Sequence, residues 1–549
     1  MDKKIAWFFF ILCLIYIIGF GIDMMDIDAA QYASISREML ATGDFLHVHD
    51  LGNDYLDKPP FLFWISALSM KIFGVNNFAY RFPSFLFALS ALVSTYKLCK
   101  LYYKKEIAVL SAIILVTCQA FFLINHDVRT DTILMGWVIF SIWQLAEWFQ
   151  NNKNINFLLA FIGIAGGMLT KGPIALMVPI FAFGTHFVLQ RNFKVFFRWQ
   201  YILGLIIILL LLTPMSIGLY QQFDLHPEKI VNTKKGVSGL RFFFWTQSFG
   251  RITGESEWNS HSNIFFLLQN MLWSFLPWIL FFLIGFLSDV KQLIQQKLKL
   301  LPGQEWITTG GFLLTYLSLG ISKYQLPHYI FVVFPLAAII TAKFVYTLLY
   351  QNQYPKLAKV LFIMHFIIFT LLWLVLLFLL HCFNTIPLWV AIVATGFFGV
   401  FLFLSFYKKL VVPTLLAICL FTIPGINLFL NYSVYPSLLR YQMGSIVGKW
   451  IHTNNISTNQ FFVYQYPDFW SLDFYAQGII KHKDSINQII SGDWVLLSKD
   501  KLTDLDKAQI KYQIVYQGED FHVSGLTAKF INPKTRDKAV QYYEVVKIL

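Results

Sequence analysis

Apolar stretches long enough to cross a membrane recur along this 549-residue chain to about residue 430. A helix needs about 20 predominantly apolar residues to span a bilayer core. Only 13% of the residues are charged, against about 25% in soluble domains. We therefore predict an all-α, polytopic membrane bundle of about thirteen transmembrane helices. The expected spans are 5–23, 80–97, 107–124, 131–149, 157–170, 174–190, 200–220, 264–287, 305–321, 328–350, 358–380, 386–406 and 410–430. The count is open by one or two, because the stretches near 157–190 and 305–321 are short or broken by Gly and Pro.

Basic residues gather at one end of the expected spans. The formal net charge of +13 fits the positive-inside rule, so no nucleic-acid partner is expected. If the spans alternate, one side carries Lys3, Lys4, Lys97, Lys100, Lys104, Lys105, Arg191, Lys194, Arg198, Lys291, Lys297, Lys299, Lys408 and Lys409. We predict that this side is the cytoplasm. The outer side then receives residues 24–79, 125–131, 221–263, 322–329 and everything after about 431. The first apolar run lacks a small-residue cleavage site after it, so a retained helix is expected rather than a signal peptide.

The character of the sequence changes near residue 435. Segments 461–464, 494–497, 513–516 and 542–548 have strand-like patterns, and 437–452 and 503–510 have helical ones. Charges in this tail nearly balance. We predict a transmembrane domain over residues 1–434 and a soluble, extracytoplasmic α/β domain over residues 435–549.

The first outer loop, residues 24–79, is expected to be structured. Residues 29–40 and 61–73 have helical periodicity, and both helices are predicted to lie along the outer interface. Just before the second helix, Asp57 and Lys58 precede two prolines that fix the backbone. Lys58 can pair with a phosphate, and Asp57 can hold a divalent cation. The alternative is a simple Asp57–Lys58 ion pair in a wet loop.

Two carboxylates follow the first expected span. A carboxylate at this position can act as a general base, bind a metal ion or cap the helix that follows. We assign capping to Asp26, whereas the position alone leaves the role of Asp28 open.

Further outer turns carry charged residues beside spans. We predict Arg129 as a substrate-binding residue and Asp131 as a catalytic one, although the two could instead pair with each other and Asp131 could cap a helix. Lys171 breaks the positive-inside pattern, and such exceptions are usually functional or paired. Another turn carries Lys323 and Tyr329, and we predict both, together with Lys171, as substrate-binding residues.

The large outer loop, residues 221–263, holds Arg251 and His261 shortly before a new span. They could reach a phosphate or a metal ion, although the loop could also be a solvated charged segment. The five cysteines stand apart from one another, so the sequence supports neither a zinc site nor a disulfide framework. The sequence has no dinucleotide-binding GxGxxG motif in a supporting context, and no nucleotide cofactor is expected.

Several of these motifs together resemble a known family, the lipid-linked-sugar glycosyltransferases of the GT-C fold. The resemblance is greatest to the bacterial branch that contains lipid A aminoarabinose transferases and relatives of protein O-mannosyltransferases. It runs in family order over about residues 1–340. The matching elements are Asp28 with Ala30-Gln31-Tyr32-Ala33 and Arg37-Glu38-Met39, Gly43-Asp44, Tyr55-Leu56-Asp57-Lys58-Pro59-Pro60, Tyr80-Arg81-Phe82-Pro83-Ser84, Arg129-Thr130-Asp131, Thr170-Lys171-Gly172-Pro173, Leu276-Pro277-Trp278, and Ser322-Lys323 with Leu326-Pro327-His328-Tyr329.

The resemblance implies roles for individual residues. The family's catalytic aspartate falls on Asp28, and its second loop aspartate on Asp131. The phosphate-binding lysine and tyrosine fall on Lys58 and Tyr55, and Arg251 matches a phosphate-binding arginine.

The same resemblance leaves open whether the site binds a metal ion. The family's metal-binding glutamate is replaced here by Asp57, and its histidine ligand has no counterpart in Gln247 to Arg251. His261 or His226 would have to substitute, so a divalent cation such as Zn²⁺, Mg²⁺ or Mn²⁺ is an option rather than a requirement.

We therefore expect an inverting glycosyltransferase of the bacterial cytoplasmic (inner) membrane. Its donor would be a sugar on a polyprenyl phosphate, and its acceptor a lipid such as lipid A, a glycan or a protein on the outer side. The oligomeric state is left open. One alternative is a transporter or flippase of lipid-linked sugars, which would need helix breaks at the bilayer midplane and usually an inverted repeat. Another is a membrane anchor for the soluble tail.

Overall fold

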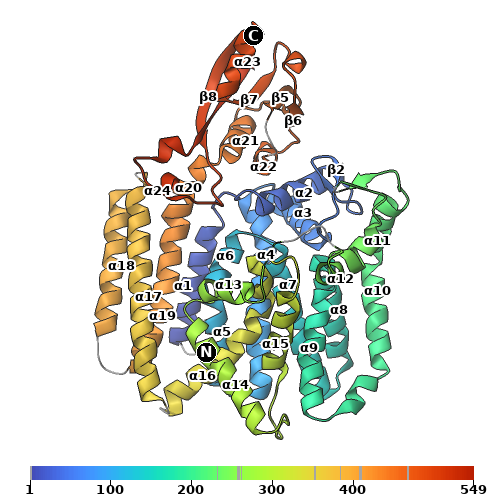
Figure 1. The fold of residues 1–549 in the computed structure, drawn as a ribbon, viewed down its shortest axis with the longest axis vertical. Helices are drawn as coiled ribbons and strands as arrows, with labels where there is room; N and C mark the ends of the chain where they lie inside the picture. Colours follow the sequence, from blue (N-terminus) through green and yellow to red (C-terminus); the bar gives the residue numbers. More distant parts are fainter. Residues whose placement is uncertain are drawn as a thin grey trace.

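The computed structural model describes residues 3–231, 233–255, 260, 262–351, 354–383, 385–406, 411–465 and 469–549. A bundle of long helices carries a small sheet domain at one end (Figure 1). In the described residues, eight helices are long and apolar enough to cross a membrane, or nine if the bent pair α5–α6 forms one span. The bundle consists of α1 (Lys3–Gly19), α4 (Asn77–Tyr102), α5 (Lys105–Val116), α6 (Gln119–His126), α7 (Thr130–Asn151), α8 (Asn154–Lys171), α9 (Ile174–Leu189), α10 (Gln200–Leu219), α13 (Phe266–Ser274), α14 (Ile279–Gln295), α15 (Ile307–Gly320), α16 (Phe334–Gln351), α17 (Pro355–Cys382), α18 (Leu388–Phe406) and α19 (Val411–Phe429).

The polytopic helical class is confirmed, but the count of about thirteen spans is not. Helices α1, α9 and α15 are apolar yet shorter than a full span. The expected span 107–124 is bent by 54° between α5 and α6, and the expected span 264–287 is divided into α13 and α14. These two breaks lie against each other, because the amide of Gln119 donates to the carbonyl of Leu276 at 2.8 Å. Polar backbone groups freed by one break are thus partly satisfied by the other.

The first outer loop forms α2 (Asp28–Thr42), α3 (Phe61–Phe73) and the two-residue strands β1 (His49–Asp50) and β2 (Asn53–Asp54). Gly43, with φ of 73°, ends α2 in the left-handed conformation that glycine adopts easily. Helices α2 and α3 were predicted to lie along the outer interface, and α2 is covered by protein. Its residues from Ala29 to Met39 are almost all buried, because α2 packs between α3 and helix α22 (Trp470–Ala476) of the sheet domain. Helix α3 does expose apolar side chains, including Leu68 and Ile72.

The remaining connections are short. They are η1 (Phe193–Phe197), η2 (Tyr220–Asp224), β3 (Ile230–Val231), β4 (Lys234–Lys235), α11 (Gly239–Arg241), η3 (Phe242–Thr246), α12 (Phe249–Thr253), η4 (Pro327–Val333) and η5 (Leu430–Val434). Asp224 accepts hydrogen bonds from the Ser238 hydroxyl at 2.5 Å and the Gly239 amide at 3.0 Å. This carboxylate therefore fixes the start of α11 in the large outer loop.

The C-terminal region is a five-stranded mixed sheet with strand order β6-β5-β7-β9-β8. Strands β6, β5 and β7 are parallel, and β9 pairs antiparallel with β7 and β8. Both faces are covered: Val463 and Leu496 pack with α21 and α22, whereas Val495 and Leu497 pack with α23. The region comprises α20 (Tyr435–Leu438), η6 (Leu439–Tyr441), α21 (Met443–Thr453), η7 (Thr458–Gln460), β5 (Phe461–Tyr464), α22, β6 (Lys481–Lys483), η8 (Ile486–Gln488), β7 (Trp494–Ser498), η9 (Lys499–Lys501), α23 (Leu502–Lys507), β8 (Tyr512–Asp520), α24 (Ala528–Ile531), η10 (Arg536–Lys538) and β9 (Gln541–Ile548).

The four predicted strands correspond to β5, β7, β8 and β9. Strand β6 was not predicted, because its three residues, Lys-His-Lys, carry no apolar signal. The predicted helix 437–452 is interrupted at Gln442, whose backbone leaves the helical region with ψ of 90°. Figure 1 places this domain at the same end of the bundle as α2 and α3. The first outer loop and the tail therefore share one side, whichever side of the membrane that is.

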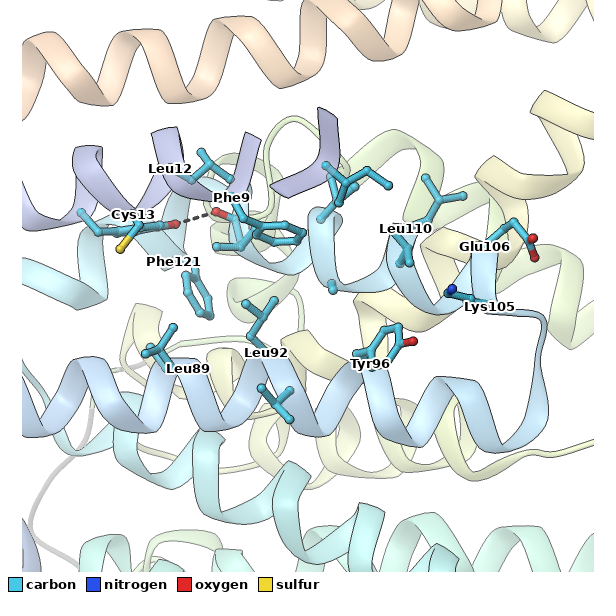
Figure 2. Close-up of a pocket in the computed structure, with 18 of the residues that line it drawn as sticks. Phe9, Leu12, Cys13, Leu89, Leu92, Tyr96, Lys105, Glu106, Leu110 and Phe121 are labelled. Carbon is cyan, nitrogen blue, oxygen red and sulfur yellow. Dashed lines mark hydrogen bonds between the residues drawn. The ribbon is translucent and has the colours of Figure 1, made fainter. Parts of the chain in front are cut away.

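Two cavities, both larger than the polar cavity of the candidate active site, lie between other helices of the bundle. One, of about 1010 Å³, is lined by apolar side chains of α1, α4 and α5, such as Phe9 and Leu92, with Lys105 and Glu106 at one end (Figure 2). The other, of about 790 Å³, holds the carboxylates of Asp289 and Glu305. Both carboxylates are already bonded within the protein, Asp289 to Lys343 and Glu305 to Thr308.

Candidate active site

A polar cavity of about 210 Å³ lies where the first outer loop meets the ends of bundle helices. It is bounded by the start of α2, the loop before α3, the start of α7, the end of α8, α12 and η4. It brings together nearly all of the predicted site residues, namely Asp28, Tyr55, Asp57, Lys58, Arg129, Asp131, Lys171, Arg251 and Tyr329. Because the cavity sits at helix ends, flexible charged side chains converge there without crossing the apolar interior.

Arg129 joins two carboxylates at one wall of the cavity. Its Nη1 donates to Asp28 Oδ2, and its Nε donates to Asp127 Oδ2 at 2.9 Å. Burial lowers the pKa of Arg129, but the charges of Asp127 and Asp28 outweigh burial, so the pKa is raised overall. The Arg129–Asp131 pair considered from the sequence does not form. Arg129 instead holds Asp28 in the first turn of α2.

Lys171 and Asp131 form a second, more buried ion pair. Lys171 Nζ lies 2.5 Å from Asp131 Oδ1, and His328 Nε2 lies 3.6 Å from Asp131 Oδ2. The Asp131 side chain is 2% exposed and that of Lys171 is 15% exposed. Lys171 also lies 4.0 Å from the centre of the Tyr329 ring. Asp131 is not an N-cap, since Arg129 occupies that position without a side-chain cap. Lys171, which is an exception to the positive-inside rule, is therefore paired with Asp131.

Lys58 enters the cavity from the loop before α3. Burial lowers the pKa of Lys58, Asp57 opposes that change, and Arg251 adds to it. Gln247 supports the same loop, because its Nε2 donates to the backbone carbonyl of Asp57. Pro59 and Pro60 immediately follow and lead into α3. The loop is thus fixed on both sides of Lys58, as the prolines predicted.

Arg251 projects from the short helix α12. Its Nη1 donates to the Tyr329 hydroxyl at 2.8 Å, and its guanidinium lies 5.0 Å from the centre of the Tyr324 ring. Its Nε is buried without a hydrogen-bond partner. Within the described part of the chain, Arg251 makes no ion pair, so its charge is available to an anion.

Lys323 does not line this cavity. Its backbone amide donates to the carbonyl of Arg251 at 3.0 Å, and its own carbonyl accepts from the amide of Ser260 at 3.0 Å. We predicted Lys323 as a substrate-binding residue, but its observed contacts hold the Arg251 loop in place.

A second cavity, of about 120 Å³, adjoins the first. Both are lined by Lys58, Lys171, Gln247, Arg251 and Tyr329. Beyond these shared residues, the second cavity is lined mostly by apolar side chains from α7, α9, α12, α15 and η4, including Ile174, Met177, Leu319 and Val332. The positively charged side chains of Lys58, Lys171 and Arg251 therefore lie between the polar cavity, which is rich in carboxylates, and the apolar cavity.

The described residues do not assemble a metal site. Within them, no three His, Cys, Asp or Glu side chains come together in a way that could hold an ion. Asp57 and Asp28 both line the cavity, but Asp28 is bound by Arg129. His261, predicted as a ligand, lies outside the described residues. His226 pairs with Glu228 at 2.8 Å and does not line the cavity.

The structure gives Asp26 a different role from the predicted one, and it adds His328 and Gln247 to the cavity. Asp26 does not cap α2, because its carboxylate accepts hydrogen bonds from Ser471 in the sheet domain. His328 and Gln247 line the cavity but were not predicted as site residues. His328 stands directly before Tyr329 at another outer turn, and that position was the available signal.

Comparison with known proteins shows what this chain is similar to. The profile of a family described as dolichyl-phosphate-mannose-protein mannosyltransferase matches residues 57–217. Among curated proteins, the chain is similar to the undecaprenyl phosphate-alpha-4-amino-4-deoxy-L-arabinose arabinosyl transferases of Erwinia tasmaniensis and Edwardsiella ictaluri. The first is 28% identical over 320 residues, covering 57% of this chain and 54% of that protein. The second is 29% identical over 362 residues, covering 64% and 61%. The matches thus span somewhat over half the length of these relatives.

Solved structures give a longer match. The structure of ArnT from Cupriavidus metallidurans bound to undecaprenyl phosphate has a TM-score of 0.75 at 16% identity, covering 99% of this chain and 98% of that one. The oligosaccharyltransferase of Archaeoglobus fulgidus in its apo form has a TM-score of 0.52 at 11% identity, covering 92% and 71%. At these identities the likeness concerns the fold. The chain therefore has the GT-C fold and resembles the glycosyltransferases of that fold.

Proposed function

We propose that this chain transfers a sugar from a polyprenyl phosphate to an acceptor outside the cytoplasmic membrane of a bacterium. The curated relatives are named for undecaprenyl phosphate and an aminoarabinose, which makes an undecaprenyl-phosphate-linked aminopentose the first donor to test. The acceptor we propose is a lipid A-like lipid, with a glycan or a protein as the other choices. No nucleotide is required, because the lipid phosphate itself is the leaving group.

The two adjoining cavities carry this proposal. A polyprenyl-phosphate sugar has an apolar tail, a charged phosphate and a polar sugar in that order. The apolar cavity, the shared residues Lys58, Lys171 and Arg251, and the cavity with Asp28 and Asp131 follow the same order. The cations would bind the phosphate in both the donor and the product. They would stabilise its charge more strongly as the glycosidic bond breaks and negative charge collects on the phosphate.

Asp28 is the proposed catalytic base. Its carboxylate lines the polar cavity and is held by Arg129. A base at this position would accept the proton of the acceptor oxygen as that oxygen attacks the anomeric carbon. Attack from the face opposite the leaving phosphate inverts the anomeric centre. Asp131 is already paired with Lys171, so we assign to Asp131 the placement of Lys171 rather than proton transfer.

A flippase or transporter fits the structure less well. The two broken helix pairs meet each other through the bond between Gln119 and Leu276, whereas the charged cavity lies at the ends of helices. A transport site is expected near the midplane, where broken helices expose backbone groups to the substrate.

The proposal is tested with the purified full-length chain in detergent. The assay supplies an undecaprenyl-phosphate-linked 4-amino-4-deoxy-L-arabinose and lipid A, and mass spectrometry measures glycosylated lipid A. Asp28→Asn should lower turnover by about a hundredfold or more. Asp44→Asn is the matched control, because Asp44 lies in the same loop and pairs with His47 outside the cavity. Normal turnover in Asp28→Asn would refute the assignment. Flipping of donor without transfer, measured with the wild-type chain reconstituted in sealed lipid vesicles, would favour a flippase.

A further inference from the structure

We infer that the C-terminal domain is part of the catalytic unit, because it holds the segment that carries Asp28. Residues 20–27 connect α1 to α2 without belonging to either helix. This inference rests on the proposed function, since it concerns the placement of the proposed catalytic base. Within this unit, Ser471 and Gln442 are positioning residues.

The first contact joins Ser471 to the carboxylate of Asp26. The Ser471 amide donates to Asp26 Oδ1 at 3.1 Å, and the Ser471 hydroxyl donates to Asp26 Oδ2 at 2.6 Å. Both carboxylate oxygens of Asp26 are therefore bound by one residue at the start of α22. Two donors on one residue fix the direction of the carboxylate as well as its distance.

The second contact binds the backbone of the same segment. Gln442 accepts from the amide of Asp26 at 3.0 Å and donates to the carbonyl of Met24 at 2.7 Å. The Ser524 hydroxyl donates to the carbonyl of Asp26 at 2.6 Å, and the Met24 amide donates to the Tyr475 hydroxyl at 2.9 Å. Gln442 itself is buried. The polar backbone groups of Met24 and Asp26 thus find their partners in the C-terminal domain, where a helix or sheet would otherwise supply them.

A third contact reaches the cavity by another route. The Trp470 indole donates to the carboxylate of Asp50 at 3.2 Å, and Gln31 donates to Asp50 at 2.6 Å. Gln31 lines the polar cavity one turn after Asp28. Phe474 belongs to the same buried cluster as α2 and α3. Helix α22 therefore packs against α2 and is linked to Gln31 through the carboxylate of Asp50.

The contacts of Ser471 and Gln442 with Met24 and Asp26, here called the clamp, lie outside the cavity. We expect catalysis to be lost when the clamp is weakened. Asp28 follows Asp26 by two residues, so a loosened Asp26 allows Asp28 to move relative to Lys58 and Arg251. A small misplacement of a reacting group costs rate rather than donor affinity. Ser471 and Gln442 do not line the cavity, which separates this effect from direct binding.

The test compares Ser471→Ala, Ser471→Thr and Asp26→Asn in the full-length protein. Ser471→Ala should lower kcat by about tenfold to a hundredfold with the KM for donor nearly unchanged, and Ser471→Thr should restore most of the loss. Hydrogen exchange should become faster at residues 23–28 in Ser471→Ala. The matched control is Ser457→Ala, which removes a hydroxyl from an exposed position of the same domain.

The outcomes separate the inference from the proposed function. Hydrogen exchange reads the clamp without any substrate, so an inactive wild type would count against the transferase alone. Asp26→Asn probes the same contact from the other partner, should Ser471→Ala fail to fold. Wild-type kcat and wild-type exchange in both variants would overturn the inference. An equal rise in exchange across the whole sheet domain would also overturn it, because that result indicates general unfolding.

Discussion

Replacing Asp131 with asparagine should destabilise the protein by about 3–5 kcal/mol, the usual cost of removing one partner of a buried ion pair. The Asp131 side chain is 2% exposed and its oxygen lies 2.5 Å from Lys171 Nζ. The substitution leaves the Lys171 ammonium buried without its counter-charge. Lys171→Met likewise leaves the buried Asp131 carboxylate without its counter-charge. The nearest remaining partner of that carboxylate is His328, whose Nε2 lies 3.6 Å from Asp131 Oδ2.

The double variant decides whether the pair acts as a unit. Asp131→Asn with Lys171→Met removes both charges, so most of the loss in either single variant should be recovered. The free energy of unfolding would be measured by denaturant titration in detergent micelles, followed by tryptophan fluorescence. Single-variant losses that add to within about 0.5 kcal/mol in the double variant would refute the pairing argument.

A second pair provides the control for function. Lys343 and Asp289 lie 2.6 Å apart outside the two adjoining cavities, with side chains 20% and 16% exposed. Lys343→Met with Asp289→Asn should show coupling in stability but no change in affinity for undecaprenyl phosphate. Lys171→Met should weaken that affinity, alone and in the double variant. Unchanged affinity in both would leave Lys171 a structural residue only.

The remaining predictions concern topology, metal dependence and pH. Cysteines placed at the exposed positions Asn53 and Ser485 should both react with an impermeant reagent from outside the cell, and labelling of only one would contradict the shared outer side. Exhaustive chelation should leave turnover unchanged, whereas Lys58→Ala should weaken donor binding with or without a divalent cation; activity lost on chelation and restored by a metal ion would contradict this. Burial, partly offset by Ser471, raises the pKa of Asp26 to about 6. Its charged form therefore destabilises the fold, so the stability linked to Asp26 is present below about pH 4 and is lost as the pH rises through about 6. The Tm should fall between about pH 4 and about pH 7, and the fall should be smaller in Asp26→Asn; equal falls in both would contradict the assignment. Asp520, whose pKa burial also raises to about 6, should account for part of the remaining fall.

The membrane class could be predicted from the sequence because lipid imposes a local requirement. A bilayer accepts only long apolar helices or closed barrels, and helix length is visible in any window of the sequence. The number of spans could not be read in the same way. Two expected spans are broken, and their breaks are stabilised by contact with each other rather than by nearby sequence.

The candidate site, too, could be predicted only in part from the sequence. Lys58, Lys171 and Asp131 could be singled out because a charge beside an apolar span is costly unless it is bound or paired. The sequence did not show which partner each would take. Asp131 pairs with Lys171 rather than with Arg129, and Arg129 reaches Asp28 from 101 residues away.

The sequence by itself therefore determined the helical membrane class, four of the five strands described in the tail and most residues that line the cavity. Each of these follows from residue type and periodicity over a few turns. Only the tertiary structure decided the ion pairs and the contact between Asp26 and Ser471, which are 445 residues apart. Such contacts depend on how helices and domains pack in three dimensions, and local periodicity carries no information about that packing.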